Sequence, residues 1–494
     1  MSSQVVIALD QGSSSSRALA IDSRGKVVAR AQFPIKTFYP EMGCIQHDPL
    51  DIARTAERAL DQVLRRLPRS TEVLGVGLAC QRSTIVFWDK ETGKPTRSAP
   101  SWQDGRAAAI VAPMQDRQAD VHDRTGLYLT PYYSAPKIRW FLENDLETRR
   151  LFEKGRLLVG PVSSFLIWRL TQGEVFAVDP TMAQRMMLFN IRSLDWDASL
   201  LELFSVDRGT LPKIVASAGS LGMIERQGRK IPLLAAIGDQ QAANYSLGAE
   251  EGAAVANYGT GAFFILNTGA RQHRIPGLLT SVAWKFDGKE PVFMQEGTVH
   301  AAGTSFDWLR DNLGLLRPGQ DIDALCRAST QRVLALQAIG GLGAPRWDYT
   351  TKTVFFGMNS QTKPADLVRG VAEGVAFLIG DIFTALESGS LKPSAVLASG
   401  GLSRISHLMQ FQADLLGVEI RRCKEPETTA MGAAALAASA AGVPWAARLR
   451  GAKFDRVFKP AISADKSARL RSGWKSFVDA QALLSVELRD LPER

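Results

Sequence analysis

Cysteine, histidine and long hydrophobic runs are all scarce in this chain of 494 residues. Its four cysteines, Cys44, Cys80, Cys326 and Cys423, lie far apart and show no CxxC or Cys/His spacing. The sequence therefore indicates neither a disulfide framework nor a zinc site. The longest run of small apolar residues, 431–447, is mostly Ala and Gly and contains Pro444. It is too short and too weakly hydrophobic for a membrane span, so it predicts a tightly packed helix. No signal peptide is visible, because apolar residues begin at Val5. We therefore expect a cytoplasmic protein with reduced thiols and no membrane span.

Charge of one sign is not concentrated either. The 59 basic and 50 acidic residues give a net charge of +9, and they are interspersed except in 448–475, where basic residues are enriched. That segment lacks interleaved stacking aromatics, so we interpret it as a solvated basic face and expect no nucleic-acid partner. The surplus charge also attracts an anion such as ATP. The length exceeds a single hydrophobic core and predicts two large domains.

A polar turn interrupts the apolar amino terminus. Residues 5–9 are apolar, Gln11-Gly12-Ser13-Ser14-Ser15-Ser16-Arg17 follow Asp10, and residues 18–21 are apolar again, which predicts a strand, a turn and a second strand. The turn amides, the hydroxyls of Ser13, Ser14 and Ser15, and Arg17 can surround phosphate oxygens, while Asp10 can hold a hydrated Mg²⁺. Asp-x-Gly-Ser is also ordinary hairpin-turn chemistry, so the motif alone leaves both interpretations open.

A second copy of this device occurs halfway along the chain. Residues 253–258 are apolar, Gly259-Thr260-Gly261 form a phosphate-sized turn, and residues 262–266 resume the strand. Helices are predicted over 49–67, 302–313 and 365–388, and strands over 26–33, 73–78, 233–237 and 395–398. This alternation predicts an α/β fold, and two hairpins in two halves suggest duplicated domains that hold one nucleotide. The boundary is predicted at 248–252.

Motifs in a fixed order then identify a family. They include Ala8-Leu9-Asp10-Gln11-Gly12, His47-Asp48-Pro49, Gln81-Arg82, Gly238-Asp239-Gln240-Gln241, Tyr258-Gly259-Thr260-Gly261, Trp308-Leu309-Arg310-Asp311 and a signature from Tyr132 to Asn144. With them the chain resembles FGGY-type carbohydrate kinases of the actin, hexokinase and heat-shock ATPase superfamily, and within that family it is most similar to the glycerol kinases.

The resemblance implies a fold and an activity. The fold is α/β, with two ribonuclease-H-like (actin/hexokinase-type) domains around a central cleft. Residues 1–248 would bind the polyol or sugar and supply the catalytic base, and residues 249–494 would bind the nucleotide. The activity is ATP- and Mg²⁺-dependent phosphorylation of a small polyol, with glycerol to glycerol 3-phosphate first and an erythritol- or pentulose-like substrate as the alternative. A homodimer or homotetramer is possible within the family.

Site residues follow from the same resemblance. Asp239 is the expected catalytic base, and Asp10 and Asp239 share the Mg²⁺ environment. The residues expected to bind substrate are Arg82, Ser83, Trp102, Tyr132, Asp239, Gln240 and Phe263. Those expected to bind ATP are Ser13, Ser14, Ser15, Arg17, Thr260, Gly261, Gly303, Gly400 and Gly401. Each has a plainer interpretation: Asp239 could only cap the following helix, the aromatic residues could be core, and Gly303 could be an ordinary turn glycine.

The chain departs from the family pattern at several positions. Ser83 stands where glycerol kinases carry a Glu that accepts hydrogen bonds from two substrate hydroxyls, which leaves the substrate open. Ser399 and Ile405 replace an Asp and an Asn near the expected adenine site, which leaves nucleotide selectivity open. The short segment 225–230 lacks the longer glycine-rich loop that carries sugar-bisphosphate inhibition in some relatives. A non-catalytic ATP-binding sensor is a further alternative, against which Asp10, Arg17, Asp239 and the second hairpin all argue.

Overall fold

The computed structural model describes residues 4–248, 251–424 and 427–488, which form two compact units. Unit 1 consists of Met1–Gly248, Ser281–Phe293 and Glu427–Gly451, and unit 2 of Ala249–Thr280, Met294–Pro426 and Ala452–Arg494. Residues 1–248 therefore lie in unit 1, which also takes in two segments from later in the chain. The boundary expected at 248–252 falls partly on residues 249 and 250, outside the described part.

Unit 1 is built on a six-stranded sheet of order β14-β15-β6-β1-β2-β3. Strands β1, β2 and β3 are antiparallel in succession, whereas β6 is parallel to β1 and β15 is parallel to β6. Their bounds are β1 (Gln4–Gln11), β2 (Ser15–Asp22), β3 (Val27–Pro34), β6 (Glu72–Cys80), β14 (Met223–Arg226) and β15 (Arg229–Gly238). The predicted first hairpin is confirmed, because β1 and β2 pair from Val5 opposite Asp22 to Gln11 opposite Ser16.

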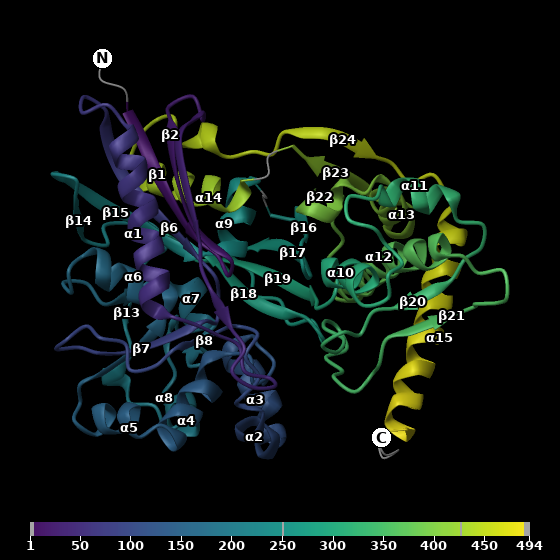
Figure 1. The fold of residues 1–494 in the computed structure, drawn as a ribbon, viewed down its shortest axis with the longest axis horizontal. Helices are drawn as coiled ribbons and strands as arrows, with labels where there is room; N and C mark the ends of the chain where they lie inside the picture. The colour runs from purple at the N-terminus through teal and green to yellow at the C-terminus, as the bar shows by residue number, and fades with distance from the viewer. Residues whose placement is uncertain (1–3, 249–250, 425–426, 489–494) are drawn as a thin grey trace. The chain divides into compact units, whose positions relative to one another are not determined.

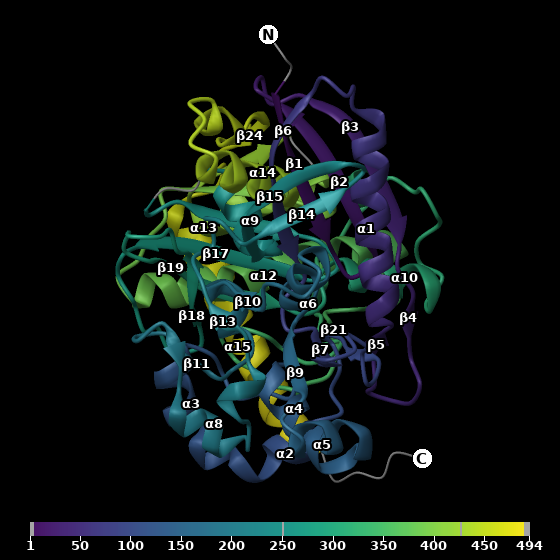
Figure 2. The same cartoon turned by 90° about the vertical axis from the view of Figure 1, so that its left-hand side faces the viewer.

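Helix α1 (Pro49–Arg66) covers one face of this sheet. Its apolar residues recur every three to four positions and are buried against β2 and β3, and Asp48 caps its first turn by accepting a bond from the Leu50 amide at 2.8 Å. Figure 2 shows α1 running along the strands. The amphipathic pattern in the sequence was therefore sufficient to predict this helix.

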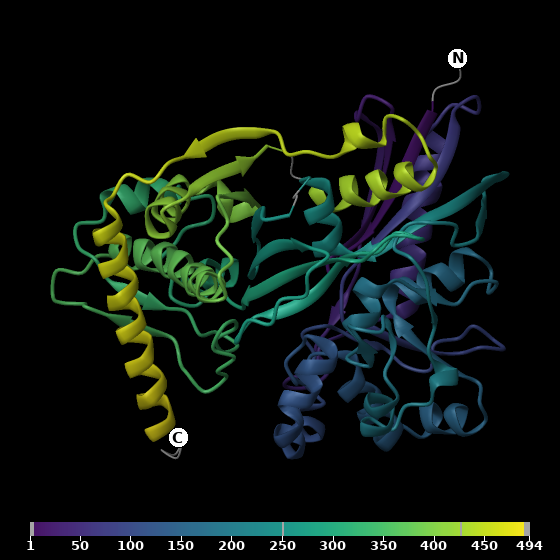
Figure 3. The ribbon, with the colours of Figure 1, turned by 180° about the vertical axis from the view of Figure 1, so that it is seen from behind.

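Helix α14 (Thr428–Ala440) lies on the other face, beside α9 (Asp239–Ser246) (Figure 3). A Cβ atom on Gly77 of β6 would come within 2.1 Å of the Ala433 carbonyl oxygen, and one on Gly432 within 1.8 Å of the Ala242 carbonyl oxygen. Backbones approach this closely only where side chains are absent. The tightly packed helix predicted from the Ala- and Gly-rich run 431–447 is confirmed as far as Ala440, beyond which the chain turns at Gly442, and the packing explains why the run is poor in large residues.

Most of the remaining residues of unit 1 come between β6 and β14 in the sequence. This part contains β7 (Ile85–Asp89), which pairs with β9 (Leu157–Pro161), together with short strands and helices that hold the loops described below. The helices are α2 (Ala108–Val111), α3 (Gln118–Thr125), α4 (Ser134–Asn144), α5 (Leu146–Glu153), α6 (Val162–Leu170), α7 (Pro180–Gln184) and α8 (Ala198–Leu203). The segment 225–230 is a tight β14–β15 turn in which Arg226 is opposite Arg229.

A second sheet has the order β18-β19-β17-β16-β22-β23-β24. The strands are β16 (Ala254–Tyr258), β17 (Ala262–Gly269), β18 (Leu279–Trp284), β19 (Val292–Val299), β22 (Ala395–Ser399), β23 (Glu419–Cys423) and β24 (Phe454–Phe458). Its inner order β19-β17-β16-β22-β23 repeats β3-β2-β1-β6-β15, with β16 antiparallel to β17 and parallel to β22. Two copies of this topology confirm the expected ribonuclease-H-like fold of both halves.

The helices of unit 2 are α10 (Gly303–Asp311), α11 (Ile322–Ala328), α12 (Pro364–Ser388), α13 (Ser406–Leu416) and α15 (Ala464–Glu487), which Figure 1 labels. In the sequence, helix α12 lies between β19 and β22, the third and fourth strands of the repeated topology. Helix α1 has the corresponding place between β3 and β6 in unit 1. Trp474 of α15 stacks on Phe377 of α12 at 4.7 Å between ring centroids, and its indole donates to Asp381 at 3.1 Å. Among the described helices, none is both long and apolar enough to cross a membrane.

Candidate active site

The carboxyl ends of three parallel strands of unit 1 meet at one edge of the sheet. The pairing register places Asp10 of β1 level with Ala79 of β6, which is in turn level with Ile237 of β15. Asp239 follows two residues later, at the start of α9. In sheets of this kind ligands bind outside the carboxyl ends of the strands. The fold therefore brings Asp10 and Asp239 to the same edge from positions more than 200 residues apart in the sequence.

The two carboxylates interact electrostatically. The pKa of Asp10 is raised from 3.8 to about 6, chiefly by burial; the Arg17 guanidinium opposes the rise, and the charge of Asp239 contributes to it. Arg17 is the direct cross-strand neighbour of Asp10 in the β1–β2 hairpin. A buried carboxyl beside a second carboxylate is costly to ionise, and it is stabilised by a cation at the same place.

Asp239 faces Arg82 as well as the start of its helix. Its Oδ1 lies 3.6 Å from Arg82 Nε and accepts a bond from the Gln240 amide at 2.7 Å. The Asp239 side chain is 28% exposed and that of Arg82 10%. Gly238 is the N-cap of α9 and no side chain caps this helix, so the interpretation of Asp239 as only a helix cap is wrong. The Asp239 carboxylate instead reaches solvent and lies beside Arg82, a residue predicted to bind substrate. Asp239 can thus accept a proton from an incoming hydroxyl while Arg82 orients it.

Trp102 and the phosphate hairpin are hydrogen-bonded to each other. The indole Nε1 of Trp102 donates to the Ser13 hydroxyl at 2.9 Å, and that hydroxyl donates to Gln81 Oε1 at 3.3 Å. The same Gln81 oxygen accepts from the Thr84 hydroxyl at 2.8 Å, and the Thr84 hydroxyl accepts from the Trp102 amide at 3.1 Å. The predicted acceptor pocket and the predicted phosphate turn are consequently joined by a closed ring of hydrogen bonds.

Tyr132 and the segment before Trp102 are held by a buried lysine. Lys137 of α4 is fully buried, and its ammonium donates to the Ser101 carbonyl at 2.6 Å and to the Tyr132 carbonyl at 2.7 Å. Burial lowers the pKa of Lys137 to about 7, while Asp104 opposes that shift and Arg106 adds to it. Lys137 thus fixes the backbone at Tyr132 and immediately before Trp102.

Ser83 adopts a conformation that non-glycine residues seldom use. Its φ is +62°, in the loop between β6 and β7, and it is 7% exposed. Residues held in this left-handed region cluster at functional sites, where the surrounding structure determines their conformation. The departure that the sequence revealed at this position therefore lies in a strained, buried loop directly after Arg82.

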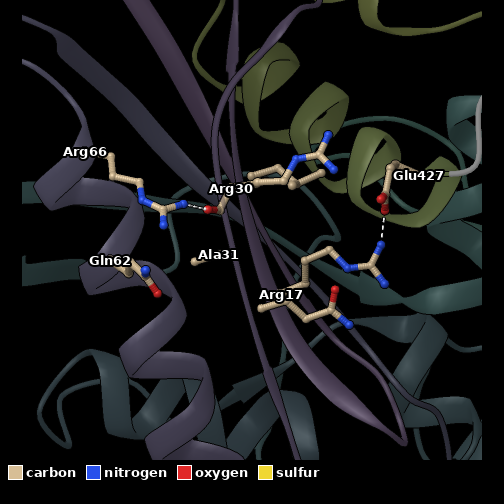
Figure 4. Close-up of a pocket in the computed structure, with 8 residues that line it drawn as sticks. Arg17, Arg30, Ala31, Gln62, Arg66 and Glu427 are labelled. Atoms are coloured by element: carbon tan, nitrogen blue, oxygen red, sulfur yellow. Dashed lines mark hydrogen bonds and ion pairs between the residues drawn. The ribbon is translucent and has the colours of Figure 1, made fainter.

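Arg17 is paired with Glu427 at the start of α14, and their side chains line a hollow of about 230 Å³ (Figure 4). Arg30 and Arg66 also line it, and Figure 4 shows the Arg17 guanidinium directed toward the Glu427 carboxylate. The Arg17 Nε is buried and, among the described residues, has no hydrogen-bond partner. An unsatisfied cationic donor beside the serine turn is suited to a phosphate oxygen.

The nucleotide residues predicted in unit 2 form a second group. The Gly303 amide donates to the Gly259 carbonyl at 2.9 Å and the Thr304 amide to the Thr260 carbonyl at 3.1 Å, so loop and turn are joined. A Cβ on Gly303 would lie 2.6 Å from that Gly259 oxygen. Close packing therefore explains the glycine at this position.

Gly400 and Gly401 differ from each other. Gly400 has a φ of +88°, and a Cβ there would lie 2.4 Å from the Tyr258 carbonyl, so the fold itself requires glycine. A Cβ on Gly401 would meet nothing within 4 Å, so packing does not explain this glycine. Ile405 is buried between a short 3-10 helix (Gly401–Arg404) and α13.

A magnesium ion fits the donor set only if other ligands complete it. Within residues 4–248, 251–424 and 427–488, no group of three or more His, Cys, Asp or Glu side chains is arranged to hold a metal. Mg²⁺ commonly binds through one or two carboxylates together with waters and substrate phosphates. Asp10 and Asp239 supply two carboxylates, and burial together with the charge of Asp239 raises the pKa of Asp10, so a cation bound there would stabilise its ionised form.

The structure brings most of the predicted residues together within each unit. Unit 1 holds those of the first hairpin and Arg82, Ser83, Trp102, Tyr132, Asp239 and Gln240, whereas Phe263 lies on β17 of unit 2 with Thr260 and Gly261. Sequence reasoning gave no role to Gln81, Thr84, Lys137 or Glu427. The first three stand in or beside recognised motifs, which was an available signal, but Glu427 is 410 residues from Arg17 and gave none.

Comparison with known proteins gives consistent results for both halves of the chain. Residues 5–246 match the model of the FGGY family of carbohydrate kinases, N-terminal domain, and residues 254–441 match that of its C-terminal domain. The glycerol kinase of Alkaliphilus oremlandii is 38% identical over 96% of this chain and 96% of its own length, and that of Vibrio cholerae serotype O1 is 38% identical with the same coverage.

Solved structures agree with these matches. A crystal structure of Plasmodium falciparum glycerol kinase with ADP superposes with a TM-score of 0.90 at 28% identity and covers 97% of this chain and 98% of that chain. A xylulose kinase from Rhodospirillum rubrum has a TM-score of 0.86 at 20% identity over 97% of this chain and 99% of its own, and shares the fold.

Proposed function

Because the chain belongs to the FGGY family of carbohydrate kinases, we propose that it transfers the γ-phosphoryl group of ATP to a hydroxyl of glycerol, giving glycerol 3-phosphate. It is an ATP-dependent kinase, and glycerol kinases 38% identical over 96% of the chain support glycerol as the acceptor. The observation that carries the proposal is the meeting of Asp10 and Asp239 at the carboxyl ends of parallel strands, with Arg82 3.6 Å from Asp239.

Each residue would perform a simple task. Asp239 would accept the proton of the attacking hydroxyl, and Arg82 would donate a hydrogen bond that orients the acceptor. Trp102 and Tyr132 would provide an apolar surface for the carbon chain, with Ser83 and Gln240 among the acceptor's polar neighbours. Positioning and charge neutralisation supply most of the rate of such a transfer.

The phosphate groups would be held by residues of both hairpins. Arg17 and the turn at Ser13, Ser14 and Ser15 come from β1–β2, and Thr260 and Gly261 come from β16–β17. The adenine would lie near Gly303, Gly400 and Gly401, where Gly401 leaves the backbone open to a flat base. Bound Mg²⁺ would neutralise developing charge on the transferred phosphoryl group, and Asp10 with Asp239 would hold it.

A second candidate acceptor is a longer polyol or a ketose. Ser83 removes a carboxylate that would accept two hydroxyl hydrogen bonds, and it leaves the volume of that side chain to the pocket. A substrate with one or two more carbons could use that volume. The sensor alternative has less support, since both family models that match the chain are those of carbohydrate kinases and the chain retains Asp10, Arg17 and Asp239.

An acceptor screen tests the proposal. ADP release is measured with a coupled assay on the purified enzyme with MgATP and, in turn, glycerol, erythritol, dihydroxyacetone and a pentulose. We expect ADP release that depends on the acceptor, with glycerol active. If a pentulose alone supports turnover, the FGGY kinase remains but its substrate is the alternative. If ATP is bound but no acceptor supports turnover, the sensor interpretation is correct.

A further inference from the structure

The ring of hydrogen bonds around Ser13 links two sites with different ligands. Ser13 belongs to the turn between β1 and β2, which carries the predicted phosphate ligands, whereas Trp102 belongs to the predicted acceptor pocket. Their side chains meet at 2.9 Å, with the indole N–H as donor. Because an indole has a single donor, Trp102 can make this bond only when its ring lies in one orientation.

Gln81 extends the link to the hairpin backbone. Its Nε2 donates to the Gly12 carbonyl and to Gln11 Oε1, both at 3.3 Å, while its Oε1 accepts from Ser13 and Thr84. The backbone N–H of Gln81 also donates to the backbone carbonyl of Gln11 at 2.8 Å. Two sets of hydrogen bonds therefore connect Trp102 to the turn residues, so a displacement of Trp102 would change the positions of those residues. One set passes through Ser13, and the other passes through Thr84 and Gln81.

The side chain of Trp102 is exposed enough for a bound acceptor to contact it. The residue is 37% exposed, so part of its ring is accessible to a ligand, while Lys137 fixes the preceding carbonyl of Ser101 at 2.6 Å. Because the backbone is anchored and the ring is partly exposed, the side chain of Trp102 is the part that a bound acceptor can immobilise. A bound polyol stacked on that ring would restrict it to the orientation that the Ser13 bond requires.

We propose that Trp102 is a positioning residue that couples acceptor binding to the ordering of the phosphate hairpin through its bond to Ser13. The inference rests on the proposed function, since it assigns the acceptor to Trp102 and phosphate to the hairpin. Ordering by the first ligand reduces the entropy cost of binding the second, which gives positive cooperativity. By linkage, ATP strengthens acceptor binding by the same factor.

A double-mutant cycle in ligand binding tests this coupling. The dissociation constant of Mg²⁺ with a non-hydrolysable ATP analogue is measured by calorimetry without glycerol and with saturating glycerol, and the ratio of the two is the coupling factor. Trp102→Phe keeps an aromatic ring but removes the donor, and Ser13→Ala removes its partner. The matched control is Trp196→Phe, because the Trp196 indole donates to the Pro212 carbonyl at 3.0 Å, outside the predicted site.

We expect glycerol to tighten analogue binding in the wild-type enzyme and in the Trp196→Phe control. The coupling factor should fall by about two- to tenfold in Trp102→Phe, the effect of losing one net hydrogen bond. Ser13→Ala should lose a similar amount, and the double variant no more than either single variant, because both changes remove one interaction. A wild-type coupling factor in Trp102→Phe, or additive losses in the double variant, would overturn the proposal.

A second pair of variants tests the same coupling without changing Trp102 itself, so that a local defect at Trp102 cannot account for the result. Lys137→Met releases the carbonyls of Ser101 and Tyr132, and Lys285→Met is its control, because Lys285 also donates to backbone carbonyls, among them that of Phe286 at 2.9 Å. Only Lys137→Met should lower the coupling factor. If the wild-type enzyme shows no acceptor-dependent ADP release at all, the proposed function fails; if it does and the coupling survives these changes, the link alone fails.

Discussion

Asp10→Asn should stabilise the ligand-free protein while it abolishes phosphoryl transfer. The folded protein raises the pKa of Asp10 from 3.8 to about 6, so the folded state holds this proton more tightly than the unfolded state does. The favourable contribution of the protonated form is complete below pH 3.8 and is lost as the pH rises through 6. Asparagine resembles the permanently neutral form and removes that loss.

The magnitude follows from the shift. A difference of roughly two pKa units at 1.36 kcal/mol each gives up to about 3 kcal/mol of added stability at pH 8. At pH 5, where wild-type Asp10 is already largely protonated in the folded state, the same arithmetic gives about half that gain. With Mg²⁺ and ATP present, the wild-type enzyme should instead be more stable than Asp10→Asn. Ligand binding stabilises the wild-type enzyme by mass action, and this binding requires the Asp10 carboxylate.

Equilibrium urea unfolding followed by tryptophan fluorescence, at pH 5 and pH 8 with a metal chelator present, measures this difference. Asp287→Asn changes an exposed aspartate of unit 1 and controls for the loss of one negative charge. If Asp10→Asn were equal to the wild type or less stable at pH 8, or if its advantage did not shrink at pH 5, the argument that Asp10 is a destabilised, ligand-requiring carboxylate would be wrong.

Further expectations concern the base, the substrate and the Arg17 ion pair. Asp239→Asn should lower kcat by 10²- to 10⁴-fold with little change in ATP affinity, because the amide cannot accept the hydroxyl proton; a variant that kept a tenth of the wild-type kcat would place the base elsewhere. Ser83→Glu should raise kcat/KM for glycerol by about tenfold or more, since a charge-assisted hydrogen bond is worth roughly 1.5–3 kcal/mol, and should lower that for larger acceptors; unchanged values for both would refute the pocket argument. Glu427→Gln should lower the KM for ATP a few-fold by freeing Arg17 from its ion pair, and an unchanged KM in steady-state kinetics would show that the pair does not compete with phosphate.

Local patterns in the sequence predicted much of the fold. The β1–β2 hairpin follows from an apolar run broken by Gly12 and serines, and α1 follows from apolar spacing after Asp48-Pro49, because each depends on neighbouring residues. The repeat of this hairpin at Gly259-Thr260-Gly261 predicted the duplicated topology.

Long-range packing could not be predicted in this way. The Ala- and Gly-rich composition of α14 indicated close contact, but not that Gly432 approaches Ala242 of α9 and Ala433 approaches Gly77 of β6. The Arg17–Glu427 pair and the Trp102–Ser13 bond likewise join residues that are distant in the sequence. Such partners are set by tertiary structure, for which the periodicity of a single segment contains no information.

The central claim is most directly tested by ³¹P NMR of the products formed by the wild-type enzyme from MgATP and glycerol. The account predicts glycerol 3-phosphate and ADP in equal amounts, no ADP above background when glycerol is omitted, and formation of both products at least about a hundredfold slower with Asp239→Asn. Release of inorganic phosphate without a phosphorylated polyol, or ADP formation that is the same with and without an acceptor, would contradict it.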